Sequence, residues 1–213
     1  MNKNTQVKIS YDVQEFPFRE VIEEVLGTKF IEKIHLEEEY EVFVKGTDQS
    51  TTWHRRYYSN LDKFLPHYEK FIYEVIRPQF QEEIVYQKVP TFRTQLVNNL
   101  GVFSFHKDRD YQHNQEELNF FLPITDAYST NTIWVESEED KADYAPITAL
   151  YGETVMWNGC HLSHGNKLNN TSNTRISVDF RVIPISKYQE DPNTGSIYTK
   201  MKFAIGDYYS VTK

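Results

Sequence analysis

A histidine and an aspartate stand two residues apart at positions 106 and 108, in a segment whose residue types alternate. If this segment is extended, His106 and Asp108 point the same way, because successive side chains of a strand face opposite sides. One neutral imidazole and one carboxylate are then two adjacent ligands for a divalent metal ion. A second histidine would complete a facial triad of two histidines and one carboxylate, which leaves coordination positions open for oxygen chemistry.

A His-x-Asp pair is a weak motif by itself, because a chain with seven histidines forms such pairs by chance. A simple hydrogen-bonded pair at a strand end is the alternative. His161 and His164, near the far end of the strand-rich region, are the two candidates for a third ligand. A hydrogen-bonding or solvent-facing role suits His54 and His113 better. Cys160 is the only cysteine, so the metal must be held by nitrogen and oxygen, and we expect this thiol to be buried and unreactive.

Arg175 follows His164 by eleven residues, an interval that lets one strand end at the histidine and the chain return on a neighbouring strand. A guanidinium can grip a carboxylate through two parallel contacts while it stays charged in a buried site. Ser177 shares the face of Arg175 and would donate its hydroxyl to the same carboxylate. A dicarboxylic keto acid suits this arrangement, with its keto end on the metal, its far carboxylate on Arg175 and Ser177, and one position left for O2.

Two further residues, Arg93 and Gln95, alternate on segment 91–97 and would project from one strand face into the same core. A buried cation needs a partner, so Arg93 either contacts a carboxylate of the substrate or co-substrate or pairs with Asp179 or Glu136. Gln95 would face the co-substrate beside it. Both readings of Arg93 stay open at this point.

Arg181, Asn119 and Trp134 are the remaining site candidates. Arg181 shares a strand face with Arg175 and would bind an anionic group of the substrate, or else form a buried network with Asp179. Asn119 would donate a hydrogen bond to the keto acid or hold neighbouring backbone. Trp134, like Trp157, is interpreted as core or as a wall of the substrate pocket.

The elements that must position these residues are mostly strands. Segments 16–26, ended by Gly27, and 61–76, with Asn60 as N-cap, have the apolar spacing of helices. Beyond Pro78 the chain contains short runs rich in β-branched and aromatic residues, which predict strands at 84–89, 91–97, 101–106, 118–124, 131–137, 147–152, 154–159 and 175–184. This pattern indicates a mainly β (α+β) double-sheet jelly roll of the cupin type, with the N-terminal helices packed on one sheet.

The length of 213 residues suits a single domain, 1–213. Within it we expect a mainly helical N-terminal support at 1–80, the strand-rich core at 81–185, and a C-terminal extension at 186–213 with one or two extended segments. Acidic residues outnumber basic ones, 31 to 23, and no run of Lys or Arg is long enough to follow a phosphate backbone, so nucleic acid is not expected as a partner. Neither a signal peptide nor a membrane span is evident, so we expect a soluble, cytoplasmic protein.

Three separated motifs carry a family resemblance. His106-x-Asp108, then His164, then Arg175-x-Ser177 resembles the Fe(II)/2-oxoglutarate dioxygenase superfamily, whose core is a double-stranded β-helix. More narrowly, the chain resembles the streptomycin-biosynthesis-type oxygenases, a branch associated with tailoring of small molecules, at 105–111, 117–119, 131–137 and 164–181. The Gly165-Asn166 that follows His164, and the step to Arg175, match the family pattern, so the resemblance favours His164 over His161.

The resemblance implies an enzyme that uses Fe(II), 2-oxoglutarate and O2 to hydroxylate a small molecule or to oxidise a C–H bond in a related way. His106, Asp108 and His164 would be its metal ligands and catalytic residues. A cupin-type metalloenzyme without a keto-acid co-substrate and a non-enzymatic ligand-binding jelly roll are the alternatives. The prime substrate and the oligomeric state are not readable from the sequence.

Overall fold

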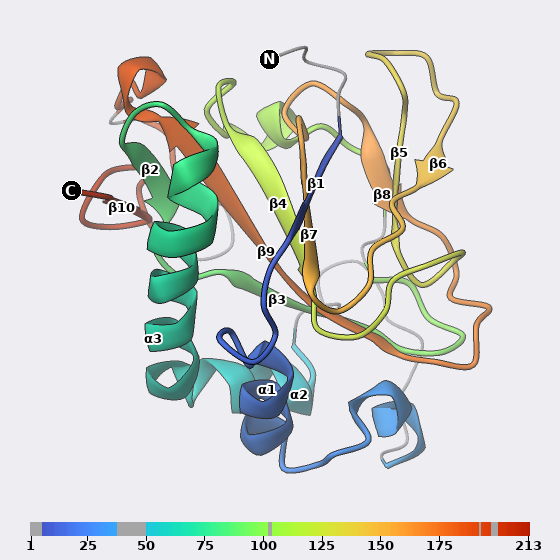
Figure 1. Ribbon diagram of the computed structural model, residues 1–213. Coiled ribbons are helices and arrows are strands. Elements are labelled where there is room, and N and C mark those ends of the chain that lie inside the picture. The colour runs from blue at the N-terminus through green and yellow to red at the C-terminus, as the bar shows by residue number, and fades with distance from the viewer. Residues whose placement is uncertain (1–5, 38–49, 102–103, 192, 197–199) are drawn as a thin grey trace.

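Two antiparallel β-sheets form the centre of the structure, a computed structural model that describes residues 6–37, 50–101, 104–191, 193–196 and 200–213 (Figure 1). The larger sheet has the strand order β1 (Val7–Ser10), β7 (Glu153–Trp157), β4 (Leu118–Pro123), β9 (Arg175–Pro184), β2 (Ile84–Gln87) and β10 (Tyr209–Val211), with β3 (Thr91–Gln95) paired to β9 beside β2. The smaller sheet has the order β6 (Ala145–Pro146), β5 (Ile133–Val135) and β8 (His164–Asn166).

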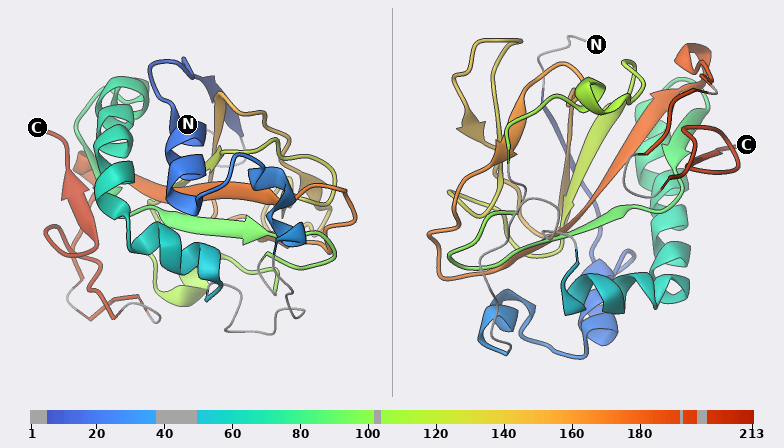
Figure 2. Two further views of the ribbon diagram at one scale, coloured as in Figure 1. Left: turned by 90° about the horizontal axis from the view of Figure 1, so that it is seen from below. Right: turned by 180° about the vertical axis from the view of Figure 1, so that it is seen from behind.

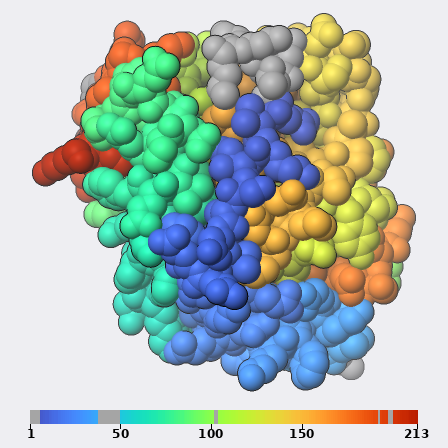
Figure 3. Space-filling model, in the orientation of Figure 1, coloured from blue at the N-terminus to red at the C-terminus, as the bar shows by residue number. Residues whose placement is uncertain are grey.

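Three α-helices cover one face of the larger sheet: α1 (Phe18–Leu26), α2 (Thr52–Tyr58) and α3 (Leu61–Phe71) (Figures 1 and 2). The two predicted helices are confirmed: Gly27 ends α1 in the left-handed conformation, and α3 runs on into a π-helical turn, Ile72–Ile76. Asn60 precedes α3 as predicted, but its side chain makes no capping hydrogen bond. The space-filling view shows the N-terminal third of the chain, in blue and green, over much of this face (Figure 3).

Strand β9 separates the helical layer from the interior between the sheets, because its side chains alternate. Those that join the helix-side core are Ile176, Val178, Phe180 and Val182. Those that line a cavity on the opposite face are Arg175, Asp179 and Arg181, and Ser177 points the same way, since it accepts a hydrogen bond from Arg175. The cavity is also lined by β8 of the smaller sheet, so it lies between the two sheets.

Most of the predicted strands are confirmed, and the differences concern local pairing. Segment 147–152 is not a strand, because Ala149 forms only an isolated bridge with Ala127. Segment 101–106 is not a regular strand in its described part, and positions 102 and 103 lie outside the described residues. Strand β1, within the region expected to be mainly helical, extends the larger sheet along β7. A strand in the C-terminal extension was expected, and β10 is one.

The prediction that Arg175 returns on a strand next to that of His164 is wrong in its topology. β8 pairs with β5 in the smaller sheet, whereas β9 lies in the larger one. The two strands therefore face each other across the cavity instead of sharing hydrogen bonds. Among the residues that the structure describes, no helix is long and apolar enough to cross a membrane.

Candidate metal centre

A single pair of backbone hydrogen bonds brings His106 and His164 together. The amide of His106 donates to the carbonyl of His164 at 3.0 Å, and the amide of His164 donates back at 2.9 Å. Residues in such an antiparallel bridge lie directly opposite each other, with their side chains on the same face. The ring centroids are accordingly 4.6 Å apart.

Asp108 completes a group of three possible metal ligands. Its Oδ1 lies 3.5 Å from Nε2 of His106 and 3.5 Å from Nε2 of His164. One ligand atom from each of the three residues falls within 4.8 Å of the others. Lys107, which lies between them, is extended, with φ −109° and ψ 139°, so His106 and Asp108 point the same way as the alternation predicted. A 3-10 turn, Asp108–Tyr111, begins at Asp108. Its amide donates to the carbonyl of Gly159 at 3.0 Å, which anchors the turn.

Both imidazoles are oriented for metal binding by backbone carbonyls. Nδ1 of His106 lies 2.8 Å from the carbonyl oxygen of Ser104, and Nδ1 of His164 lies 3.0 Å from that of Leu162. Because a carbonyl oxygen only accepts, each Nδ1 carries a proton, and the lone pair of a neutral ring is on Nε2. Two Nε2 lone pairs then converge with a carboxylate oxygen, an arrangement that needs a cation at its centre. The donor set fits a divalent metal ion such as Fe(II).

Titration of the cluster agrees with this demand for positive charge. Burial lowers the pKa of His164, but the hydrogen bond and charge of Asp108 outweigh it, so the pKa lies above its ordinary value. Burial raises the pKa of Asp108, but the charge of Arg181 and the two imidazoles outweigh it, so this pKa lies well below its ordinary value.

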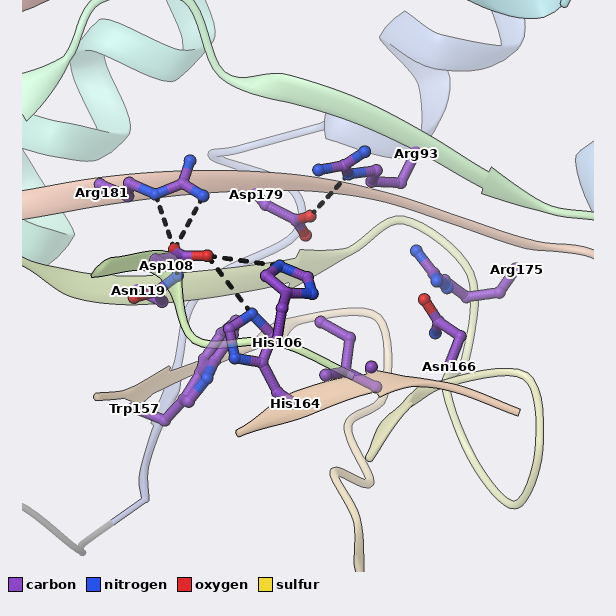
Figure 4. Close-up of a pocket in the computed structure, with 12 residues that line it drawn as sticks. Arg93, His106, Asp108, Asn119, Trp157, His164, Asn166, Arg175, Asp179 and Arg181 are labelled. Atoms are coloured by element: carbon purple, nitrogen blue, oxygen red, sulfur yellow. Dashed lines mark hydrogen bonds and ion pairs between the residues drawn. The ribbon is translucent and has the colours of Figure 1, made fainter. Parts of the chain in front are cut away.

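The second oxygen of Asp108 is held by the protein. Oδ2 accepts from Nη2 and Nε of Arg181, at 2.8 and 3.0 Å, and from Nδ2 of Asn119 at 2.7 Å. Asn119 Oδ1 in turn accepts from the amide of Gly159 at 3.1 Å. Glycine is required at 159, because a Cβ there would lie 2.6 Å from the Asn119 side chain. Oδ1 is thus the oxygen that faces the two imidazoles (Figure 4).

Arg175 lies at the other end of the cavity, 1% exposed, with neutral partners only. Its Nη1 donates to Ser177 Oγ at 2.7 Å, its Nη2 to Gln95 Oε1 at 3.2 Å, and its Nε to the carbonyl of Asn131 at 3.1 Å. Within the described parts of the chain it forms no ion pair, although the charge of Asp179 is near enough to raise its pKa slightly. Burial dominates and lowers the pKa of Arg175 to about 10.

Arg93 and Asp179 form an ion pair between these two ends, with Arg93 Nε 3.1 Å from Asp179 Oδ2. Of the alternatives for Arg93, the pairing with Asp179 is therefore present. The predicted Arg181–Asp179 network is wrong, because the guanidinium of Arg181 turns to Asp108. Arg93 Nη1 and Asp179 Oδ1 are buried without a hydrogen-bond partner.

The structure brings most of the sequence-predicted residues to one cavity (Figure 4). Its lining includes His106, Asp108, His164, Asn119, Arg93, Arg175 and Arg181. Gln95 is not among the lining residues, but its Oε1 accepts a hydrogen bond from Arg175. Trp134 is not among the lining residues and instead carries Lys167 Nζ 3.4 Å above its ring, so its role in substrate binding stays a prediction. His161 lies outside the cluster, with Nε2 3.1 Å from the carbonyl of Gln115.

Asn166 is a lining residue to which the sequence assigned no site role. Asn166 donates to Gln95 Oε1 at 3.2 Å and so helps to position the acceptor of Arg175. Its place two residues after His164 on one strand was the available signal, because such residues share a face. Trp157, which the sequence suggested as core or as pocket wall, lines the cavity, and its indole Nε1 is buried without a hydrogen-bond partner. Cys160 is buried, and burial raises its pKa, as expected for an unreactive thiol.

Comparison with known proteins gives one close relative and several structural neighbours. The streptomycin biosynthesis protein StrG of Streptomyces griseus is 35% identical over 202 residues, which cover 95% of this chain and 96% of that protein. No family model matches the sequence.

Among solved structures, the non-heme alpha ketoglutarate dependent carbocyclase SnoK from nogalamycin biosynthesis matches with a TM-score of 0.64 and 11% identity, covering 99% of this chain and 93% of SnoK. EctD from S. alaskensis, solved with 2-oxoglutarate and 5-hydroxyectoine, matches with a TM-score of 0.53 and 11% identity, covering 91% of this chain and 77% of EctD. At such identities the matches show the fold, and they confirm the double-stranded β-helix core.

Proposed function

The chain belongs to the family of the streptomycin biosynthesis protein StrG, and from this premise we propose that it is an Fe(II)- and 2-oxoglutarate-dependent oxygenase of a small molecule. His106, Asp108 and His164 would hold the metal. When bound, Fe(II) supplies the activation of O2, which couples decarboxylation of 2-oxoglutarate to succinate and CO2 with oxidation of a substrate C–H bond.

The main support for this proposal is that Arg175 is buried and has only neutral hydrogen-bond partners. A guanidinium that is fully buried among neutral groups is costly, and an incoming carboxylate removes the cost by forming a charge-assisted pair. A dicarboxylic keto acid provides such a group at one end and a metal-chelating group at the other. SnoK, by its description, depends on the same keto acid, and EctD was solved with it, so the shared fold supports this assignment.

The chain's own residues then divide the work. Ser177, Gln95 and Asn166 orient the guanidinium of Arg175 toward the cavity. The carbonyls of Ser104 and Leu162 keep the imidazole Nε2 atoms directed at the metal position. Asn119, proposed from the sequence to contact the keto acid, uses its amide to hold Asp108. The Arg93–Asp179 pair is the part of the lining that we assign to the substrate side.

The experiment that tests the proposal measures succinate formation and O2 uptake by the purified protein with Fe(II), in the presence and absence of 2-oxoglutarate. We expect both signals to require the keto acid, even for slow turnover without the prime substrate. His164→Ala should abolish them, whereas His161→Ala, outside the cluster, should retain them. O2 uptake that does not require the keto acid would favour the cupin-type alternative, in which Arg175 has no co-substrate carboxylate to bind. A protein that binds no stoichiometric metal would favour the ligand-binding jelly roll.

A further inference from the structure

The C-terminal segment, defined here as residues 200–213, reaches the ionic network behind the metal centre. The hydroxyl of Tyr209 donates to Glu117 Oε1, and the hydroxyl of Tyr208 accepts from Arg181 Nη1 at 3.3 Å. Strand β10 fixes these contacts, because it pairs with β2 and places Tyr209 opposite Gln87, whose side-chain oxygen also accepts from Arg181. A separate apolar cluster seats the segment on the sheet: Val85, Ile183, Phe203, Tyr208 and Tyr209.

Glu117 is the centre of this network. It is 0% exposed, and its Oε2 lies 3.3 Å from Nε of Arg181 and 3.0 Å from Nδ1 of His113. Arg181 in turn holds Asp108 Oδ2 through two hydrogen bonds. The three side chains form a buried row of negative, positive and negative charge that runs from the metal position outward to Tyr209.

The sum of the charges in this row sets the net charge around the metal position. Arg181 alone would cancel the charge of Asp108 and leave two neutral imidazoles as the remaining ligands. With Glu117 ionised, the row keeps one net negative charge, which favours a divalent cation over an empty site. A buried carboxylate needs donors around it, and those of Glu117 include Arg181, His113 and the hydroxyl of Tyr209. Burial and the charge of Glu117 raise the pKa of Tyr209, so this hydroxyl stays protonated and donates.

We propose that the C-terminal segment helps to position a ligand of the metal centre. Tyr209 holds Glu117, and Glu117 balances the positive charge of Arg181. Arg181 in turn positions Asp108 so that Oδ1 alone faces the metal. Glu117, Arg181 and Tyr209 are positioning residues, since they act through Asp108. The inference rests on the proposed metal site and deepens it, because it gives a task to a segment that the sequence marks only as an extension.

The test measures Co(II) and Fe(II) affinity of the full chain by anaerobic titration, together with the visible absorption spectrum of bound Co(II). Glu117→Gln keeps the shape of the side chain and removes its charge, so it should raise the dissociation constant by about 10- to 100-fold, the usual cost of disturbing groups behind metal ligands. Tyr209→Phe keeps the ring and should raise it in the same direction by a smaller factor. Both should alter the Co(II) spectrum, because Asp108 would shift.

Tyr188→Phe is the matched control. It also removes one phenol hydroxyl near the C-terminus, but among the described residues this hydroxyl bonds only to the amide of Ile205 and to the carboxylate of Glu190. Its affinity and spectrum should equal those of the wild type. If Glu117→Gln and Tyr209→Phe lower the melting temperature but bind Co(II) like the control, the role is merely structural and the inference is overturned. If the wild type itself binds no metal, the proposed function fails and the inference fails with it.

Discussion

Strand β9 carries one arginine at each end of the cavity, and the two arginines differ in the charge of their partners and in the direction of their pKa shifts. Arg175 is held by three neutral acceptors, and burial lowers its pKa to about 10. Arg181 lies against Asp108 and Glu117, and their charges, with that of Tyr208, outweigh burial and hold its pKa well above the ordinary value. Both guanidiniums lie on the same face of one strand, and Arg175 is buried while Arg181 is largely buried. Only one has its counter-charge built in.

The difference separates binding residues from framework residues. A protein supplies the counter-charge itself where the cation belongs to its own architecture, as for Arg181. Where the charge stays uncompensated, as for Arg175, the missing anion is expected from a ligand. Four experiments test this difference between the two arginines, and the largest expected effect comes first.

The largest effect is expected at the metal ligands. Asp108→Ala and His106→Ala should abolish stoichiometric Fe(II) binding, a loss greater than the roughly 10- to 100-fold cost of changing groups behind the ligands. Metal analysis of protein purified and reloaded anaerobically measures this. His161→Ala is the control and should bind one equivalent. If Asp108→Ala retained iron, Asp108 would not be a metal ligand, and Arg181 would have no ligand to hold in place.

The stability of the metal-free protein should distinguish the two arginines directly. Arg181→Met leaves Asp108 and Glu117 buried without their cation, which should cost about 3–5 kcal/mol of unfolding free energy. Arg175→Met removes an isolated buried charge along with hydrogen bonds to neutral acceptors, so the two effects offset each other and the loss should be much smaller. Urea unfolding of both variants is the measurement. Equal losses would contradict the division into framework and ligand-binding ends.

Binding of 2-oxoglutarate should depend on Arg175. Arg175→Gln should retain Fe(II) but weaken the binding of 2-oxoglutarate by about 2–5 kcal/mol, which raises its dissociation constant roughly 30-fold or more. The reason is that the buried carboxylate of the keto acid would lose its charged partner. Anaerobic calorimetry with the Fe(II)-loaded protein measures the affinity. Arg55→Gln, at an exposed arginine that donates to the backbone of Ser50, is the matched control. Unchanged affinity in Arg175→Gln would place the far carboxylate elsewhere.

The smallest effect is a dependence on pH. The raised pKa of His164 means that its contribution to stability is complete below its ordinary value of 6.5 and is lost as the pH rises through the higher folded value. The metal-free protein should therefore lose melting temperature as the pH rises above 6.5. Protein loaded with Co(II) should not show this loss, since the metal replaces the proton. His164→Gln should remove the slope from the metal-free protein, and a slope that persists would assign it to another group.

Local periodicity determined a large part of the site in advance. The alternation of residues 175–181 already placed Arg175 and Ser177 on one face, since side chains of a strand alternate whatever the strand pairs with. The spacing at 61–76 likewise predicted a helix with an apolar face. The identity of the possible metal ligands followed from residue types, because only a few side chains bind such ions.

The tertiary structure alone decided which charges and which histidine meet. His164 joins His106 through the register of one backbone bridge, and His161, three residues earlier, falls outside it. Arg181 pairs with Asp108, whereas the sequence spacing suggested Asp179 as its partner. For Arg93 the sequence left several partners open, and the structure shows that Asp179 is the one. The C-terminal strand closes the network through Glu117. Such partners are chosen by distance across sheets, and a linear spacing carries no information about that distance until the register of the strands is known.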